Sequence, residues 1–281
     1  MFRKVHTLEP NQVIDFYLSK KGISTKHKKN ILRIKSGVLS DAKVYQKLSV
    51  LNKTHLVKDK ISKIDQAAEN SLEFLYKTYV KESGVREFIF KQSLLCPGCQ
   101  RSYATKRSTL DHFLPSSHYP NFYVLPWNLV PTCGDCNRIK NNAIPQSKKD
   151  NLPHPYFNSL LFKKNWLKVV IRNTVPLTYE FTFDEQLKGY EKQMVLNHLL
   201  AYNLENVFIS HISTIFSEHD EDFKEIFEDS GYGELKDYIE ILKQEAYVSN
   251  SRKKKFWPIN IEYAFLSALF ESDWFCQNYY L

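Results

Sequence analysis

Apolar residues recur at helical spacing in the first third of the chain. Between residues 41 and 91, apolar side chains return every three or four positions, which is the period of an amphipathic helix. Gly84 is expected to end this helix, because glycine is favoured just beyond a helix C-terminus. The stripe predicts a basic helical region over residues 1–91 with one side packed in a core. Its members are Ile61, Ile64, Ala68, Leu72, Leu75 and Tyr79.

The pattern changes at residue 92. As far as residue 150, Pro, Cys, Asn and Ser interrupt short apolar runs, which indicates a compact, loop-rich module with a short helix after Cys133. Alternation in LTYEFTF then indicates a strand or hairpin. Helices dominate from Glu191, and the aromatic stretch NIEYAFLSALFESDWFCQNYYL forms a core helix or a partner surface. The sequence therefore predicts an α+β, mostly α-helical fold, with a mainly helical region at 151–281.

Charge separates the chain into two halves. Residues 1–150 carry 26 Lys and Arg against 12 Asp and Glu, a net charge of +14, whereas the remaining residues carry 13 against 19, or −6. A lysine-rich composition alone would raise the charge of both halves. The asymmetry favours contact of the first half with a polyanion such as nucleic acid.

The chemistry expected of the cysteines depends on the compartment in which the protein resides. The start MFRKVHTLEP is not followed by the apolar run of a signal peptide, and the apolar runs are too short to span a bilayer. We therefore expect a cytoplasmic protein without membrane contact. In that reducing compartment, paired cysteines are metal ligands more often than disulfides.

Four of the five cysteines form two CxxC pairs. Two such pairs provide the four thiolates of a tetrahedral structural zinc site. The pairs are Cys96 with Cys99 and Cys133 with Cys136, and 33 residues separate them, so an element must be inserted between the pairs. A site closed by four thiolates leaves no open position for chemistry. The predicted zinc therefore clamps a short module, and Cys276 is expected to be a small buried hydrophobe.

Candidate chemistry lies inside this clamp, in TLDHFLP. Asp111 offers a hard oxygen ligand for Mg²⁺ or Mn²⁺, and His112 suits a general base. Asn137 offers a second oxygen, while Arg138 and Lys140 are donors for phosphate. Neighbours on a regular strand point to opposite faces, so Asp111 and His112 share a site only if the strand bends after them.

These residues resemble the HNH, or ββα-metal, nucleases. Members of that family carry Asp-His near the end of a first strand, an Asn in the loop that enters a second strand, and Asn or His on the following helix. Here the matching positions are Asp111 with His112, then Asn128, then Asn137. Many members also carry two CxxC pairs around this core. The resemblance covers residues 95–142 and implies a central ββα-metal module with a structural zinc in region 92–150.

The resemblance also implies roles. Asp111 and Asn137 would hold one catalytic Mg²⁺ or Mn²⁺, His112 would activate water, and Asn128 would brace the loop. Phosphodiester hydrolysis by a one-metal mechanism is the implied reaction, on DNA or on a structured RNA such as tRNA. Lys106 and Arg107 precede the Asp-His pair and are further candidates for contact with the phosphate backbone.

A longer stretch, NFYVLPWNLVPTCGDCNRIKNN followed by HPYF, resembles the HNH subunits of bacterial anti-phage systems. These include the nuclease partner of the Septu ATPase, which is also found with some retrons. That resemblance implies a bacterial cytoplasmic effector of antiviral defence held by an ATPase partner, with the acidic, aromatic C-terminal half as a docking surface.

Two other functions compete with hydrolysis. The chain could be a non-catalytic zinc module that binds nucleic acid, or an interaction subunit whose nuclease core is degenerate. Neither requires the quartet Asp111, His112, Asn128 and Asn137 to be present together, so the quartet favours catalysis.

The basic run at residues 19–35 yields the first testable prediction. Replacing Lys26, Lys28 and Lys29 together with Gln should weaken nucleic-acid binding and flatten the plot of log affinity against log salt, because fewer counterions are released. Fluorescence anisotropy over a salt series measures both effects. Unchanged affinity would mean that these lysines only face solvent.

Overall fold

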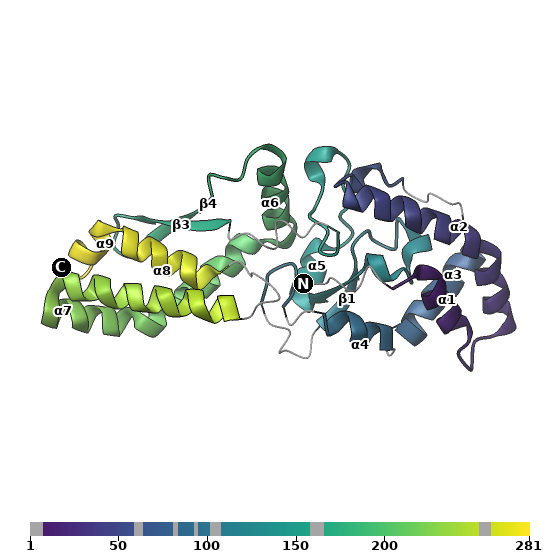
Figure 1. Ribbon diagram of the computed structural model, residues 1–281, viewed down its shortest axis with the longest axis horizontal. Coiled ribbons are helices and arrows are strands. Elements are labelled where there is room, and N and C mark those ends of the chain that lie inside the picture. Colours follow the sequence, from purple (N-terminus) through teal and green to yellow (C-terminus); the bar gives the residue numbers. More distant parts are fainter. Residues whose placement is uncertain are drawn as a thin grey trace. The chain divides into compact units, whose positions relative to one another are not determined.

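The computed structural model describes residues 8–58, 64–80, 84–92, 95–101, 108–157, 166–252 and 260–281 (Figure 1). Contacts divide the chain into two units. Unit 1 comprises Met1–Ser159 with Gln193–Tyr202, and unit 2 comprises Leu160–Lys192 with Asn203–Leu281. The described chain is mostly helical, with one two-stranded antiparallel sheet in each unit. The mostly α-helical character predicted from the sequence is therefore confirmed.

Unit 1 contains five helices among its described residues, besides the C-terminal part of α6. A π-helical turn at Tyr76–Val80 extends α3, and short 3₁₀ turns lie at Thr54–Leu56, Pro120–Phe122, Pro126–Asn128 and Lys148–Asp150. The helices are α1 Pro10–Leu18, α2 Thr25–Val50, α3 Gln66–Leu75, α4 Gly84–Phe90, α5 Gly134–Lys140 and α6 Gly189–Tyr202.

Local capping and left-handed residues decide where the N-terminal helices begin and end. The Ser24 side chain accepts the His27 amide hydrogen at 3.2 Å to begin α2, and Asp65 does the same for Ala68 at 2.9 Å in α3. Asn52, at φ 55°, follows the end of α2. The helical stretch predicted over residues 41–91 is thus several helices.

The predicted apolar stripe packs as expected where it is described. Ala68, Leu72 and Leu75 are fully buried, and the side chain of Ile64 is half-buried. Gly84 does not end this helix: it is the first residue of α4. Ile61 lies outside the described residues. The basic residues Lys26 and Lys29 are exposed in the first turn of α2, as a polyanion surface requires, and Lys28 is half-buried.

The sheet of unit 1 pairs β1, Ser108–His112, with β2, Leu129–Cys133. Leu110 opposite Pro131, and His112 opposite Leu129, set the antiparallel register. A proline is tolerated because both strands of a two-stranded sheet are edges. The short helix predicted after Cys133 is α5, which follows β2 directly.

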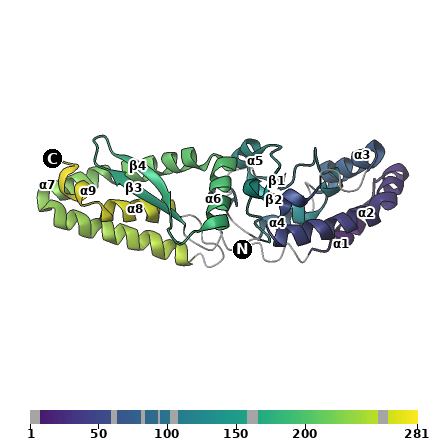
Figure 2. The same cartoon turned by 90° about the horizontal axis from the view of Figure 1, so that it is seen from above.

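Unit 2 holds a hairpin and a helical layer. The predicted hairpin is confirmed as β3 Leu167–Arg172 paired with β4 Thr178–Phe183. Buried and exposed residues alternate along β3, whose buried side packs on α8, and α8 in turn lies along α7 (Figures 1 and 2). The helices are α7 Leu204–Arg252, α8 Ile261–Glu271 and α9 Asp273–Asn278.

The aromatic C-terminal stretch forms a core. Gly231, at φ 83°, breaks α7 into two arms, and Phe223 on the first arm meets Tyr238 on the second with ring centroids 6.1 Å apart. Phe265 and Phe275 from α8 and α9 are fully buried, and their rings pack on the first arm. Of the two alternatives for this stretch, core packing is the one observed. Cys276 is buried, as predicted.

Candidate metal centre and adjoining cavity

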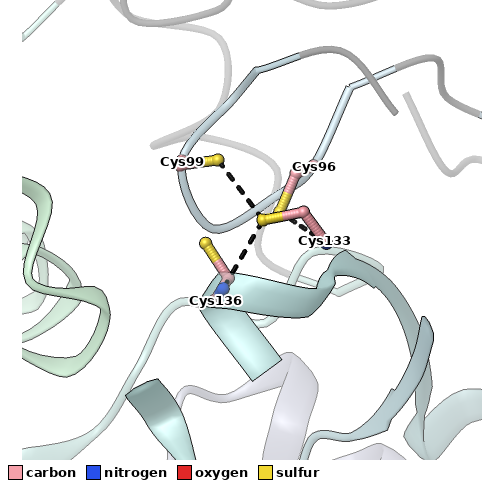
Figure 3. A group of neighbouring side chains, drawn as sticks. All are labelled: Cys96, Cys99, Cys133 and Cys136. Atoms are coloured by element: carbon pink, nitrogen blue, oxygen red, sulfur yellow. Dashed lines mark hydrogen bonds between the residues drawn. The ribbon is translucent and has the colours of Figure 1, made fainter. Parts of the chain in front are cut away.

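Four cysteine thiols converge on one point of unit 1 (Figure 3). The sulfur atoms of Cys96, Cys99, Cys133 and Cys136 all lie within 4.8 Å of one another, and those of Cys99 and Cys133 are 3.8 Å apart. A tetrahedron with zinc–sulfur bonds of 2.3 Å would separate its sulfurs by about 3.8 Å. The donor set and its spacing therefore fit a zinc ion, and the predicted pairing of the two CxxC motifs in one site is observed.

Backbone geometry prepares both pairs. The Cys96 amide donates to the carbonyl of Arg101 at 2.9 Å, and the Gln100 amide donates to the carbonyl of Cys96 at 2.7 Å, which closes a tight turn. The second pair opens α5, where the Cys136 amide donates to Cys133 Sγ at 3.5 Å. An amide donor favours negative charge on sulfur, so this arrangement suits a metal-bound thiolate.

The C-terminal part of α6 packs against the first pair. His198 Nε2 donates to the carbonyl of Gly98 at 2.8 Å, and Tyr202 lies beside the same glycine. A Cβ atom at position 98 would lie 2.8 Å from Cys136 Sγ and 3.1 Å from the Tyr202 ring. Glycine is required here because any side chain would displace the Cys136 sulfur.

Beside the cysteines, a cavity of about 330 Å³ opens at the end of β1. Three of the residues predicted to act in catalysis, Asp111, His112 and Asn137, line it together. The remaining lining residues are Pro115, Ser116, Gly134, Arg138, Asn141 and Asn142. Asp111 and His112 face one cavity because β1 ends at His112 and the chain bends there, so the alternation of a regular strand no longer applies.

Asn128 lies behind the cavity wall. Its side chain is fully buried and binds the backbone of Leu114 twice, accepting from the amide at 2.8 Å and donating to the carbonyl at 2.9 Å. Its own carbonyl accepts from the Phe113 amide at 2.8 Å. These bonds hold the bend that follows His112, which is the geometry a bracing residue needs.

His112 is oriented by groups that sequence reasoning did not find. Its Nε2 lies 3.0 Å from the carbonyl oxygen of Tyr123, and a carbonyl only accepts, so Nε2 carries the hydrogen and Nδ1 is the acceptor. The Tyr76 ring packs 4.6 Å from the imidazole, and the Tyr76 hydroxyl donates to the Leu110 carbonyl at 2.7 Å. Burial lowers the pKa of His112 to about 4, which keeps the imidazole neutral near pH 7.

Lys140 does not lie where it was predicted to act. Its side chain is completely buried, and its ammonium lies 2.9 Å from Asp111 Oδ2 and 2.9 Å from the His112 carbonyl. The prediction that Lys140 contacts phosphate is therefore wrong. Position in α5 explains the burial, because Lys140 follows Cys136 by four residues and so shares its inward face. Burial also raises the pKa of Asp111, and Lys140 opposes that rise.

The remaining predicted phosphate contacts differ in their setting. Arg138 lies at the cavity, largely exposed, with its guanidinium 2.7 Å from Asp135. Lys106 and Arg107 lie outside the described residues. Predicted contact of Arg138 with phosphate stays a prediction, and the geometry leaves this side chain within reach of a ligand in the cavity.

The donors around the cavity also fit a hard divalent cation. Asp111 offers a carboxylate, Asn137 an amide oxygen, and the cavity has room for several water molecules. Oxygen donors of this kind suit Mg²⁺ or Mn²⁺. The ligand set is sparse, however, since only one of the two side chains carries charge.

Comparison with known proteins gives one relative by sequence. The chain is 27% identical over 188 residues to protein ea31 of Escherichia phage lambda. The alignment covers 62% of this chain and 61% of that protein, so it spans less than two thirds of the relative. No family model matches the chain, and no solved structure matches it. Within the part of the chain that the structure covers, no helix is both long and apolar enough to cross a bilayer.

The glycine between Cys96 and Cys99 yields a test of the metal centre. Gly98→Ala should cost about 1–3 kcal/mol of stability through overpacking and should lower zinc retention, because the new methyl group would displace Cys136 Sγ. Zinc content after dialysis against a mild chelator, together with the melting temperature, measures both.

Gly84→Ala is the matched control, since a methyl group there meets no atom within 4 Å. It should retain zinc as the wild type does. Equal zinc retention in the two variants would contradict the proposed closeness of Gly98 to the metal centre.

Proposed function

We propose that this protein is a metal-dependent endonuclease of the HNH type that hydrolyses phosphodiester bonds in nucleic acid. One observation carries the proposal: Asp111, His112 and Asn137 line a single cavity. In His112, Nε2 donates its hydrogen to the Tyr123 carbonyl, so Nδ1 is the nitrogen that can accept a proton. A carboxylate oxygen and an amide oxygen can bind one divalent cation, and a neutral imidazole beside them can act as the base in hydrolysis.

In this proposal each side chain has a separate task. His112 takes a proton from water at Nδ1, while the Tyr123 carbonyl and the Tyr76 ring hold the imidazole in place. Asp111 and Asn137 would hold Mg²⁺ or Mn²⁺, which when bound would stabilise charge that develops on the phosphate. Arg138, which lines the cavity and is largely exposed, would contact a phosphate oxygen.

The cysteines have a structural task in this proposal. Because α5 begins within the second CxxC pair, a zinc ion there would hold the helix that carries Asn137 against the strand that carries His112. The excess of basic residues in the first 150 positions supports a polyanionic substrate, either DNA or structured RNA.

A non-catalytic zinc module that binds nucleic acid is the alternative. It would use the same basic surface and cysteines but would not need His112 to be oriented by Tyr123 and Tyr76 beside an open cavity. That orientation favours catalysis. Membership of an anti-phage complex with an ATPase stays a prediction from resemblance, and cytoplasmic location stays a prediction from the sequence.

Three substitutions test the catalytic assignment. His112→Ala should lower cleavage about 10²–10⁴-fold, the usual effect of losing a general base, while zinc content and nucleic-acid affinity remain. Cleavage of plasmid DNA and of tRNA in Mg²⁺ or Mn²⁺ measures the effect. His211→Ala, in α7 of unit 2, is the matched histidine control and should keep wild-type activity.

Asn137→Ala should instead raise the concentration of Mg²⁺ or Mn²⁺ that gives half-maximal cleavage, because it removes an oxygen ligand. Asp111→Ala should do the same and also lower stability, since it leaves the buried Lys140 ammonium without its counter-charge. Full activity of His112→Ala would end the hydrolytic proposal and leave the zinc module as the better description.

A further inference from the structure

Lys140 and Asp111 form a buried ion pair next to the cavity. Lys140 is 0% exposed at its side chain and Asp111 8%, and their charged atoms are 2.9 Å apart. Lysine is almost never buried to this extent unless it is paired. Asp111 also lines the cavity, so one carboxylate serves the core and the cavity at once.

The same ammonium donates to the carbonyl of His112 at 2.9 Å. Lys140 therefore holds both neighbours at the end of β1, the backbone of one and the side chain of the other. Because its ammonium binds Oδ2 of Asp111, a ligand in the cavity meets a carboxylate that is already paired with a cation. Lys140 reaches no solvent, so it acts on a ligand only through Asp111 and His112.

Charges around the cavity leave little to attract a cation. The negative charge of Asp111 is balanced by Lys140, the Asn137 amide is neutral, and the positive charge of Arg138 at the rim is paired with Asp135. Sites that bind Mg²⁺ in proteins use one or two carboxylates together with substrate phosphates. Here the protein supplies one carboxylate whose charge is already compensated, whereas a phosphodiester would bring anionic oxygens.

We propose that Lys140 is a positioning residue which, by neutralising Asp111, makes divalent-cation binding in this cavity depend on an anionic phosphate ligand. This inference rests on the proposed function and adds the order of assembly: cation and phosphodiester bind together, and each strengthens the other. Such coupling is reciprocal, because the free energy of forming the ternary complex does not depend on the path.

Direct measurement of Mn²⁺ binding tests the coupling without cleavage. The zinc-loaded full chain with His112→Ala is titrated with Mn²⁺, and free Mn²⁺ is followed by electron paramagnetic resonance. The titration is repeated with a short DNA duplex and with dimethyl phosphate. Mn²⁺ should bind weakly to the protein alone and about 5- to 150-fold more tightly with either phosphodiester, the usual range of coupling between two ligands. Equal affinity with and without phosphodiester would overturn the proposal.

A second set of variants tests the role of Lys140. Lys140→Gln keeps a donor for the His112 carbonyl but removes the charge, so Mn²⁺ should bind more tightly in the absence of phosphodiester and the coupling should shrink toward one. Lys168→Gln, which removes an exposed charge from β3 in unit 2, is the control and should keep the coupling. Unchanged coupling in Lys140→Gln would overturn the role of Lys140.

Removal of a buried charge can also prevent folding. Lys140→Met, whose unbranched apolar side chain suits a buried position, is the second variant and should show the same loss of coupling. If neither variant melts cooperatively, the comparison of Mn²⁺ affinity with and without phosphodiester in the protein that retains Lys140 still decides whether binding is coupled.

Failure of the inference is distinguishable from failure of the proposed function. The dimethyl phosphate titration needs neither cleavage nor a nucleic-acid surface. A wild-type protein that cleaves no DNA or RNA yet shows the coupling would disprove the nuclease and retain the cation site. A protein that cleaves DNA but binds Mn²⁺ equally well without phosphodiester would support the nuclease and disprove the coupling.

Discussion

Convergence of four thiols is the interaction on which the geometry of unit 1 depends. Two cysteines come from a turn ahead of β1, one from the end of β2 and one from the first turn of α5, so a metal ion bound there would join both ends of a segment of about 40 residues. The segment is rich in loops and short elements, and small modules of this kind need a cross-link beyond their own apolar core. The residues that line the neighbouring cavity lie either between these two pairs or on and just after α5, which begins at the second pair.

Helix α5 connects the cysteines to the residues of the cavity. Helix α5 begins at the cysteines and carries Asn137 toward the cavity and Lys140 toward the core. Lys140 then binds the end of β1 through Asp111 and the His112 carbonyl, and Asn128 holds the bend that follows. A substitution of one of the cysteines would therefore shift Asp111 and His112 through α5, although neither residue belongs to the cysteine cluster.

The rest of unit 1 supports His112 and the cysteines from outside the cysteine-framed segment. Tyr76, from the turn after α3, lies against His112, and residues 193–202 of α6 support the first cysteine pair. The predicted regions 1–91 and 92–150 thus share one contact unit with part of α6. An isolated segment between the cysteines would lack the ring that packs on the imidazole and the helix that packs on Gly98.

The sequence by itself determined the features that depend on local spacing. CxxC pairs restrict the ligand type and number, strand alternation marked the β3–β4 hairpin, and the apolar period marked the face of α3 that is buried. Tertiary structure decided the partners of single polar side chains. Lys140 looks like a phosphate donor in the sequence, and only its position on the inward face of α5 makes it the counter-ion of Asp111. The aromatic C-terminal stretch was equally compatible with a core and a surface, and packing against α7 made it a core. A charged or aromatic residue reads the same in the sequence whether it is buried or exposed. Contacts between residues that are distant along the chain decide which of the two it becomes.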